Sequence, residues 1–114
     1  MGSKKRVIIK RPDEDYGYMT AISFSLENLQ KTVGGPIEVV TIMDSLLGEP
    51  LRMIINEEGK LRNLPYNFMC CGGRDYIVGD VIVCGLNEAG DDLSDIPITF
   101  QEWKRILDKI RGCA

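Results

Sequence analysis

Short runs of hydrophobic residues, separated by charged or turn-forming residues, predict most of the strands in this chain. Three branched residues between charged flanks, followed by a partly alternating run, predict an N-terminal hairpin. Two later runs rich in β-branched residues predict neighbouring strands joined by a loop over residues 44–50. These four predicted strands are Lys5–Lys10, Tyr18–Phe24, Ile37–Ile42 and Leu51–Ile55. The first is expected at an edge of the sheet, where its basic side chains are solvated.

The patterns after residue 60 are less regular. Residues 61–73 are too irregular for a strand and too short for a stable helix, which predicts a structured crossover. Residues 76–86 form the most strand-like stretch of the chain, with a β-bulge expected at Gly79. Residues 88–95 hold four carboxylates and predict a solvated acidic loop.

Two helices are predicted from their end signals and their apolar faces. Ser25 can cap a first helix, which the pair Gly34-Gly35 ends. A capping box that begins at Thr99 opens a second helix, and Gly112 is placed to stop it. The inward residues of the two helices are expected to be Leu26, Leu29 and Val33, and Trp103, Ile106, Leu107 and Ile110.

The order of these elements predicts the fold class. Two helices and about five strands without regular β-α-β alternation predict an α+β fold, with both helices packed on a mainly antiparallel sheet. A chain of 114 residues has room for one domain, which we expect to span residues 1–114. Residues 1–3 are either native or a cloning remnant, so they take no part in this prediction.

Composition narrows the classes of function. Apolar residues make up 44% of the chain and charged residues 27%, which is typical of a globular protein. The net charge of −3 argues against general binding to duplex nucleic acid. The chain has no histidine, which excludes Ser-His-Asp and Cys-His nucleophile systems and histidine-ligated metal sites. Composition therefore favours binding over catalysis, with no cofactor.

The cysteines and the apolar runs bear on the compartment. No run approaches the roughly 18 apolar residues of a membrane helix, and the basic start is not followed by a signal sequence. The cysteines at 70, 71, 84 and 113 have no C-x-x-C pair, so we expect reduced thiols in a cytoplasm rather than a zinc site.

Four separated segments of the chain resemble one known family. They are VGGPIEVV at 33–40, IINEEGKL at 54–61, LPYN at 64–67 and DYIVG at 75–79. In order and spacing they resemble the family catalogued as domain of unknown function 3846, found in phages and in Firmicutes genomes. The family name carries no activity. Some small phage proteins of this general kind sequester the nucleotide signals of bacterial antiviral defence, so the resemblance implies that context for this chain.

Polar residues that flank two predicted strands form a candidate binding site. Glu38 lies in an otherwise apolar strand and Asn56-Glu57 follows another, so strand pairing could bring these groups together. Carboxylates and amides suit ribose hydroxyls and base edges, basic side chains suit phosphate, and aromatic rings stack on bases. The predicted ligand-binding residues are Glu38, Asn56, Glu57, Lys60, Arg62, Tyr66 and Asn67. Arg52 and Arg74 are further phosphate candidates, and Phe68 is a second candidate for stacking.

Structural roles remain open for these residues. Residues 56–60 can equally form a polar turn, with Glu38 as an exposed strand residue. The pair Gly34-Gly35 could cradle a phosphate, but a plain helix end explains it better because the glycines end a helix.

The leading hypothesis is a phage protein in the host cytoplasm that sequesters a cyclic ADP-ribose-like signal, without turnover, as a homodimer. It predicts no membrane and no nucleic-acid partner. The first alternative is a protein–protein inhibitor that uses the acidic loop or a strand edge. The second is a nucleotide hydrolase built on Glu38 and Glu57 with a metal ion.

Overall fold

The computed structural model describes residues 4–42, 51–70, 75–90 and 92–112. The elements are β1 (Lys4–Lys10), β2 (Tyr18–Ser23), α1 (Leu26–Val33), β3 (Ile37–Ile42), β4 (Leu51–Asn56), β5 (Tyr66–Cys70), β6 (Asp75–Val78), β7 (Val81–Leu86), β8 (Leu93–Ser94) and α2 (Phe100–Gly112). The predicted α+β fold is confirmed. The loop predicted over residues 44–50 lies outside the described residues.

The main sheet is antiparallel and has the strand order β2-β1-β7-β4-β3, with short β8 added to β7. Strands β5 and β6 form a separate two-stranded sheet. The prediction that the first strand is a solvated edge is wrong. Strand β1 lies between β2 and β7, and its last residue, Lys10, is 1% exposed. The two edges of the sheet path are β2 and β3.

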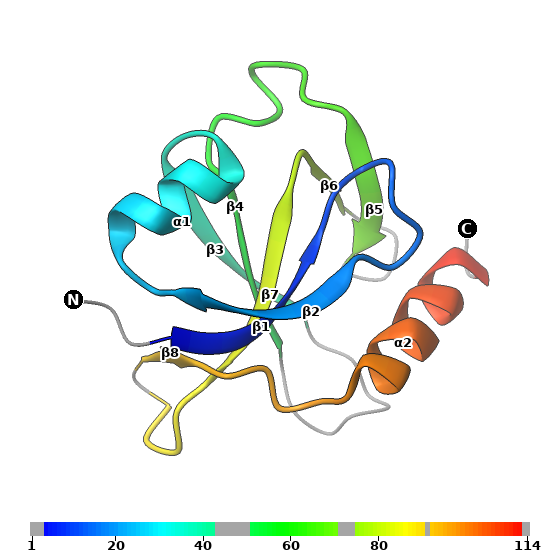
Figure 1. The fold of residues 1–114 in the computed structure, drawn as a ribbon. Coiled ribbons are helices and arrows are strands. Elements are labelled where there is room, and N and C mark those ends of the chain that lie inside the picture. Colours follow the sequence, from blue (N-terminus) through cyan, green and yellow to red (C-terminus); the bar gives the residue numbers. More distant parts are fainter. Residues whose placement is uncertain (1–3, 43–50, 71–74, 91, 113–114) are drawn as a thin grey trace.

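Each face of the sheet carries a core of its own, and Figure 1 shows α1 and α2 on opposite sides of the strands. Alternation along the central strands divides them between the faces, so that Val83 packs on one face and Ile82 on the other. On the first face, α1 covers Val7, Ile9, Leu29, Val33, Ile54, Ile82 and Cys84. On the second face, α2 and the β5–β6 hairpin enclose Ile8, Leu51, Met53, Phe68, Ile77, Val81, Val83, Ile96, Ile98, Trp103, Ile106 and Leu107.

The predicted helix ends are confirmed. The Ser25 hydroxyl accepts a hydrogen bond from the Asn28 backbone N–H, and Gly34 ends α1 with a φ of +83°. At α2, the Thr99 backbone N–H donates to the Glu102 carboxylate, and the Glu102 N–H donates to the Thr99 hydroxyl, which is a capping box. Gly112 is the last residue of α2.

Two predictions in the second half of the chain are wrong. The predicted crossover 61–73 contains β5, whose alternation is masked by an irregularity between Tyr66 and Phe68 in its pairing with β6. This irregularity lets both Asn67 and Phe68 face the interior. The predicted long strand 76–86 is two strands, because Gly79 turns the chain with a φ of +74° instead of forming a bulge.

Neither helix of the described residues has the length and apolar character needed to span a bilayer.

Candidate functional site

A hollow of about 160 Å³ lies on the hairpin side of the sheet, between the β3–β4 pair and β6. It is lined by Glu38, Val40, Ile55, Asn56, Glu57, Lys60, Asp75, Tyr76, Ile77 and Val78. Ile77 and Val78 are buried, and Val40 and Ile55 pack against the core, so these four aliphatic residues supply an apolar surface. Charged side chains surround this apolar surface. A hollow with apolar walls and a few polar groups is the usual form of a small-molecule site.

Four of the predicted ligand-binding residues line this hollow: Glu38, Asn56, Glu57 and Lys60. Glu38 reaches it because it pairs with Ile55 across the antiparallel β3–β4 ladder, which puts both side chains on the same face. Glu57 is the first residue after β4, and its backbone N–H donates to the Pro36 carbonyl. Both glutamates are exposed, and their carboxylates have no hydrogen-bond or ion-pair partner among the described residues.

Lys60 is held by two neighbours on β6. Its Nζ donates to the Asp75 carboxylate at 2.5 Å and lies 4.3 Å from the centroid of the Tyr76 ring. The hydrogen bond from Lys60, together with the one from the Tyr76 backbone N–H, lowers the pKa of Asp75 below its ordinary value. Asp75 is therefore a carboxylate at neutral pH. The contact joins the turn after β4 to the hairpin and closes one side of the hollow.

Asn56 lies at the hollow, but its side chain does not face it. Its register partner is Ile37, which packs on the α1 face of the sheet. There the Asn56 amide donates to the Val33 carbonyl at 3.3 Å and accepts from the Glu58 backbone N–H at 2.8 Å. A Cβ on Gly35 would come within 2.9 Å of this amide. The structure therefore gives the Asn56 side chain a structural role, on the opposite face from Glu38.

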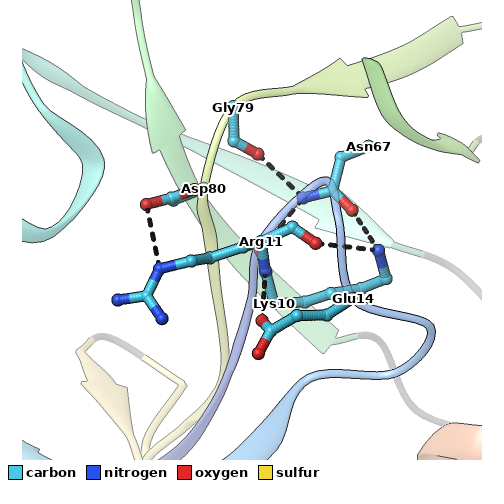
Figure 2. Close-up of polar contacts among 6 residues, drawn as sticks. All are labelled: Lys10, Arg11, Glu14, Asn67, Gly79 and Asp80. Atoms are coloured by element: carbon cyan, nitrogen blue, oxygen red, sulfur yellow. Dashed lines mark hydrogen bonds and ion pairs between the residues drawn. The ribbon is translucent and has the colours of Figure 1, made fainter. Parts of the chain in front are cut away.

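Asn67 is also buried, and it ties the hairpin to the main sheet (Figure 2). Its amide nitrogen donates to the carbonyls of Lys10, at 3.0 Å, and Gly79, at 2.7 Å. Its amide oxygen accepts from the Lys10 ammonium at 2.5 Å. Burial, followed by the nearby positive charge of Arg111, lowers the pKa of Lys10 below its ordinary value. The amide of Asn67 makes these hydrogen bonds within the protein, so it has little hydrogen-bonding capacity left for a ligand.

Further polar contacts surround the hydrogen bonds between Asn67 and Lys10. The Lys10 ammonium also donates to the Arg11 carbonyl, and the Arg11 guanidinium forms an ion pair with Asp80 at 3.6 Å. Figure 2 shows these contacts joining the end of β1 to the turn between β6 and β7. Burial raises the pKa of Asp80, and the Arg11 charge opposes that shift.

The other predicted residues lie away from this hollow, and Tyr66, Asn67 and Phe68 line a second one of about 140 Å³ together with residues of α2. Arg62 forms an ion pair with Glu58 at 2.8 Å and does not line the hollow. Tyr66 is 56% exposed on the hairpin, with its ring centroid 6.1 Å from that of Tyr76. Phe68 is buried edge-on against Trp103, so it cannot stack on a base.

The further phosphate candidates do not meet at the hollow. Arg52 pairs with Cys84 on the α1 face, where its Nη1 is buried without a hydrogen-bond partner among the described residues. Arg74 lies outside the described residues. The backbone N–H groups of Gly34 and Gly35 both donate to the Gln30 carbonyl, so they end α1 and are not offered to an anion.

Asp75 and Tyr76 line the hollow but were not predicted as site residues. They begin the DYIVG segment, in which an acidic residue and an aromatic one precede two buried residues at the start of a strand. That pattern is visible in the sequence. Its link to the hollow depends on the contact between Asp75 and Lys60, which lies 15 positions earlier in the chain. Within the described residues, no group of three or more Cys, Asp or Glu residues is arranged to hold a metal ion.

Comparison with protein families shows where the chain belongs. A family model described as "Domain of unknown function (DUF3846)" matches residues 5–109. No curated protein and no solved structure matches the chain.

Proposed function

This chain belongs to the DUF3846 family, and we propose that it binds a small nucleoside-type molecule and holds it unchanged. The observation that carries the proposal is the meeting of Glu38, Glu57 and Lys60 at one hollow, with an aliphatic wall and the Tyr76 ring. Such a surface can bind one ligand that carries both a flat apolar ring and a hydroxyl-rich sugar.

The free carboxylates suit the sugar and the edge of a base. Ionised glutamates only accept hydrogen bonds, and ribose hydroxyls and exocyclic amino groups can donate them. The aliphatic residues Val40 and Ile55 can contact a flat ring, and the exposed Tyr66 ring beside Tyr76 offers a face for stacking. We therefore place a base and a ribose in the hollow.

The charge of the hollow favours a position at its rim for any phosphate group of the proposed ligand. Its described lining has three carboxylates and one ammonium, and that ammonium already contacts Asp75 and Tyr76. Carboxylates repel a phosphate group that approaches closely. Lys60 is the cation best placed to meet a phosphate outside the hollow.

The biological setting that we propose is sequestration of a nucleotide signal, such as a cyclic ADP-ribose, by a phage protein in its host. This setting is the context that the resemblance implies, and the family name itself carries no activity. Holding without turnover is supported by the lack of histidine in the sequence, because the side chain that most often transfers protons near neutral pH is then missing.

The test is a capture experiment with a panel of cyclic nucleotides and ADP-ribose isomers. The protein is incubated with each compound, separated from free compound and heated, and the released compound is identified by mass spectrometry. We expect one compound to be depleted and then recovered intact. Recovery of a cleaved product would instead indicate a hydrolase, and no depletion of any compound would favour the protein–protein inhibitor.

Glu38→Gln tests the location of the site. This change removes the charge and keeps the shape, and we expect it to weaken capture about tenfold, as expected for the loss of one charge-assisted hydrogen bond. Glu27→Gln is the matched control, because Glu27 is an exposed glutamate in the first turn of α1. Equal capture by wild type and Glu38→Gln, with similar melting temperatures, would place the site elsewhere.

A further inference from the structure

The hollow is small for the ligand proposed, and it ends at an edge of the sheet. Its volume of about 160 Å³ is well below the roughly 300–1,000 Å³ typical of sites for drug-sized ligands. Two of its lining residues, Glu38 and Val40, belong to β3, which is the last of the described strands at that end of the sheet. Within the described residues, β3 therefore forms both a border of the hollow and an edge of the sheet.

Strand β3 has few of the features that prevent an edge strand from pairing with the edge strand of another molecule. Within Ile37–Ile42 there is no proline, glycine or lysine, and Glu38 is the single charged residue. Its six-residue register with β4 is unbroken, so no bulge in these residues turns the edge away. Val39 is 46% exposed on the face opposite the hollow. A regular apolar edge of this kind presents backbone N–H and C=O groups to another strand.

We propose that β3 pairs antiparallel with β3 of a second copy of this chain, which joins their hollows into one site. In a symmetric antiparallel pair of identical strands, the two-fold axis is perpendicular to the sheet, so both hollows lie on the same face. Glu38 and Val40 of each copy then border the seam. The shared site rests on the proposed function, whereas the strand pairing does not.

A second copy suits this edge because the strand is compatible with itself. The centre of β3 is Val39-Val40, and β-branched residues opposite one another stabilise antiparallel pairs. Glu38 lies off the centre, so a pairing centred on either valine does not place the two charges directly opposite. The contact is isologous and uses β3 of both copies, so it closes as a dimer. Strand β2, at the other end of the sheet, contributes no residue to the hollow.

Mass measurement tests the pairing without any ligand. We expect light scattering and sedimentation to give twice the mass of the chain for wild type at about 100 μM, and the mass of one chain for Val39→Lys. Val39 faces away from the hollow, so this charge blocks the edge without changing a residue of the site. Val39→Thr keeps the branched, uncharged side chain and should remain a dimer. Thr41→Lys provides a second edge variant should Val39→Lys fail to fold.

Ala21→Lys is the matched control, because Ala21 is exposed on β2 at the other edge. It should leave the dimer intact. A monomeric wild type, a dimer in both the Val39→Lys and the Thr41→Lys variants, or a monomer produced by Ala21→Lys would overturn the pairing. A dimer that captures no compound would leave the pairing standing and remove the proposed function. A monomer that captures a nucleotide would support the proposed function and overturn the pairing.

Discussion

Asn56 and Asn67 show that residue type alone does not decide between a binding role and a structural one. Both were predicted to bind a ligand, and both have buried amides that bond to backbone groups. An asparagine near a strand end has the right chemistry for either role. The choice depends on groups far away in the chain, because the Asn67 amide meets Lys10 across 57 positions. No local pattern in the sequence carries that information.

Cys84 carries a prediction about alkaline stability. It is fully buried on the α1 face, and burial raises the pKa of its thiol from 9.0 to about 12. Between these pH values the folded chain keeps a proton that the unfolded chain loses. The stabilising contribution of Cys84 is therefore complete below pH 9 and decreases as pH rises towards 12. The free energy of unfolding should fall by about 1.4 kcal/mol per pH unit from this residue alone.

Urea unfolding of wild type and Cys84→Ala at pH 7, 8, 9, 10 and 10.5 measures this effect. Other groups titrate in both proteins, so the informative quantity is the difference between their unfolding free energies. We expect that difference to be constant up to pH 8. Above pH 9 it should change in favour of the variant, because only wild type loses the contribution of Cys84. A constant difference across the whole series would contradict a protonated, buried thiol.

The β5–β6 hairpin is the element that sequence patterns described least well. The helices and the strands up to β4 follow local rules, since capping residues and branched runs act over a few positions. Strand β5 has no such pattern, because its pairing irregularity disturbs the alternation and its stability comes from β6 and from Asn67. Gly79 was noticed, but a glycine within an apolar run is compatible with either a bulge or a turn.

A pair of glycine substitutions tests the turn between β6 and β7. Gly79 and Gly90 have nearly the same backbone conformation, with φ of +74° and +75°. A Cβ at Gly79 would meet Leu64 Cδ1 at 2.8 Å, whereas a Cβ at Gly90 would meet nothing within 4 Å. Gly90→Ala should therefore cost about 1 kcal/mol from backbone strain alone. Gly79→Ala should cost about 2–4 kcal/mol, because overpacking adds to the same strain.

Chemical denaturation of the two variants, with wild type as reference, measures both costs. Shortening the obstructing side chain, as in the double variant Gly79→Ala/Leu64→Ala, should show the alanine at 79 costing less than it does with Leu64 in place. Equal costs for Gly79→Ala and Gly90→Ala would mean that Leu64 moves aside freely, and that this turn is not tightly packed.

At the scale of the molecule, the candidate site could be predicted only in part. Glu38 and Glu57 were found because an acidic residue within or after an apolar strand is visible in the sequence. Their convergence with Lys60 follows from the β3–β4 register and from the turn after β4, both of which are local. Asp75 and Tyr76 reach the same hollow through the hairpin, so their part in it depends on the long-range packing that local patterns do not specify.

The core on the α2 face joins almost every part of the fold. It contains residues of β1, β4, β5, β6, β7 and α2, such as Ile8, Met53 and Phe68. Trp103 lies at its centre, fully buried, with its ring edge-on to Phe68 at 6.0 Å and its Nε1 donating to the Tyr16 carbonyl at 2.8 Å. One side chain therefore contacts the hairpin and the β1–β2 connection from α2.

Trp103 is the single tryptophan of the chain, so its fluorescence reports on these contacts together. Because the hairpin, the sheet and α2 share one core, we expect none of them to unfold separately, as in most domains of this size. Fluorescence and far-ultraviolet circular dichroism should then give the same midpoint and the same slope in urea. A fluorescence change at lower urea than the loss of secondary structure would show that α2 or the hairpin detaches first. In that case the hollow, which β6 helps to form, would be lost before the sheet.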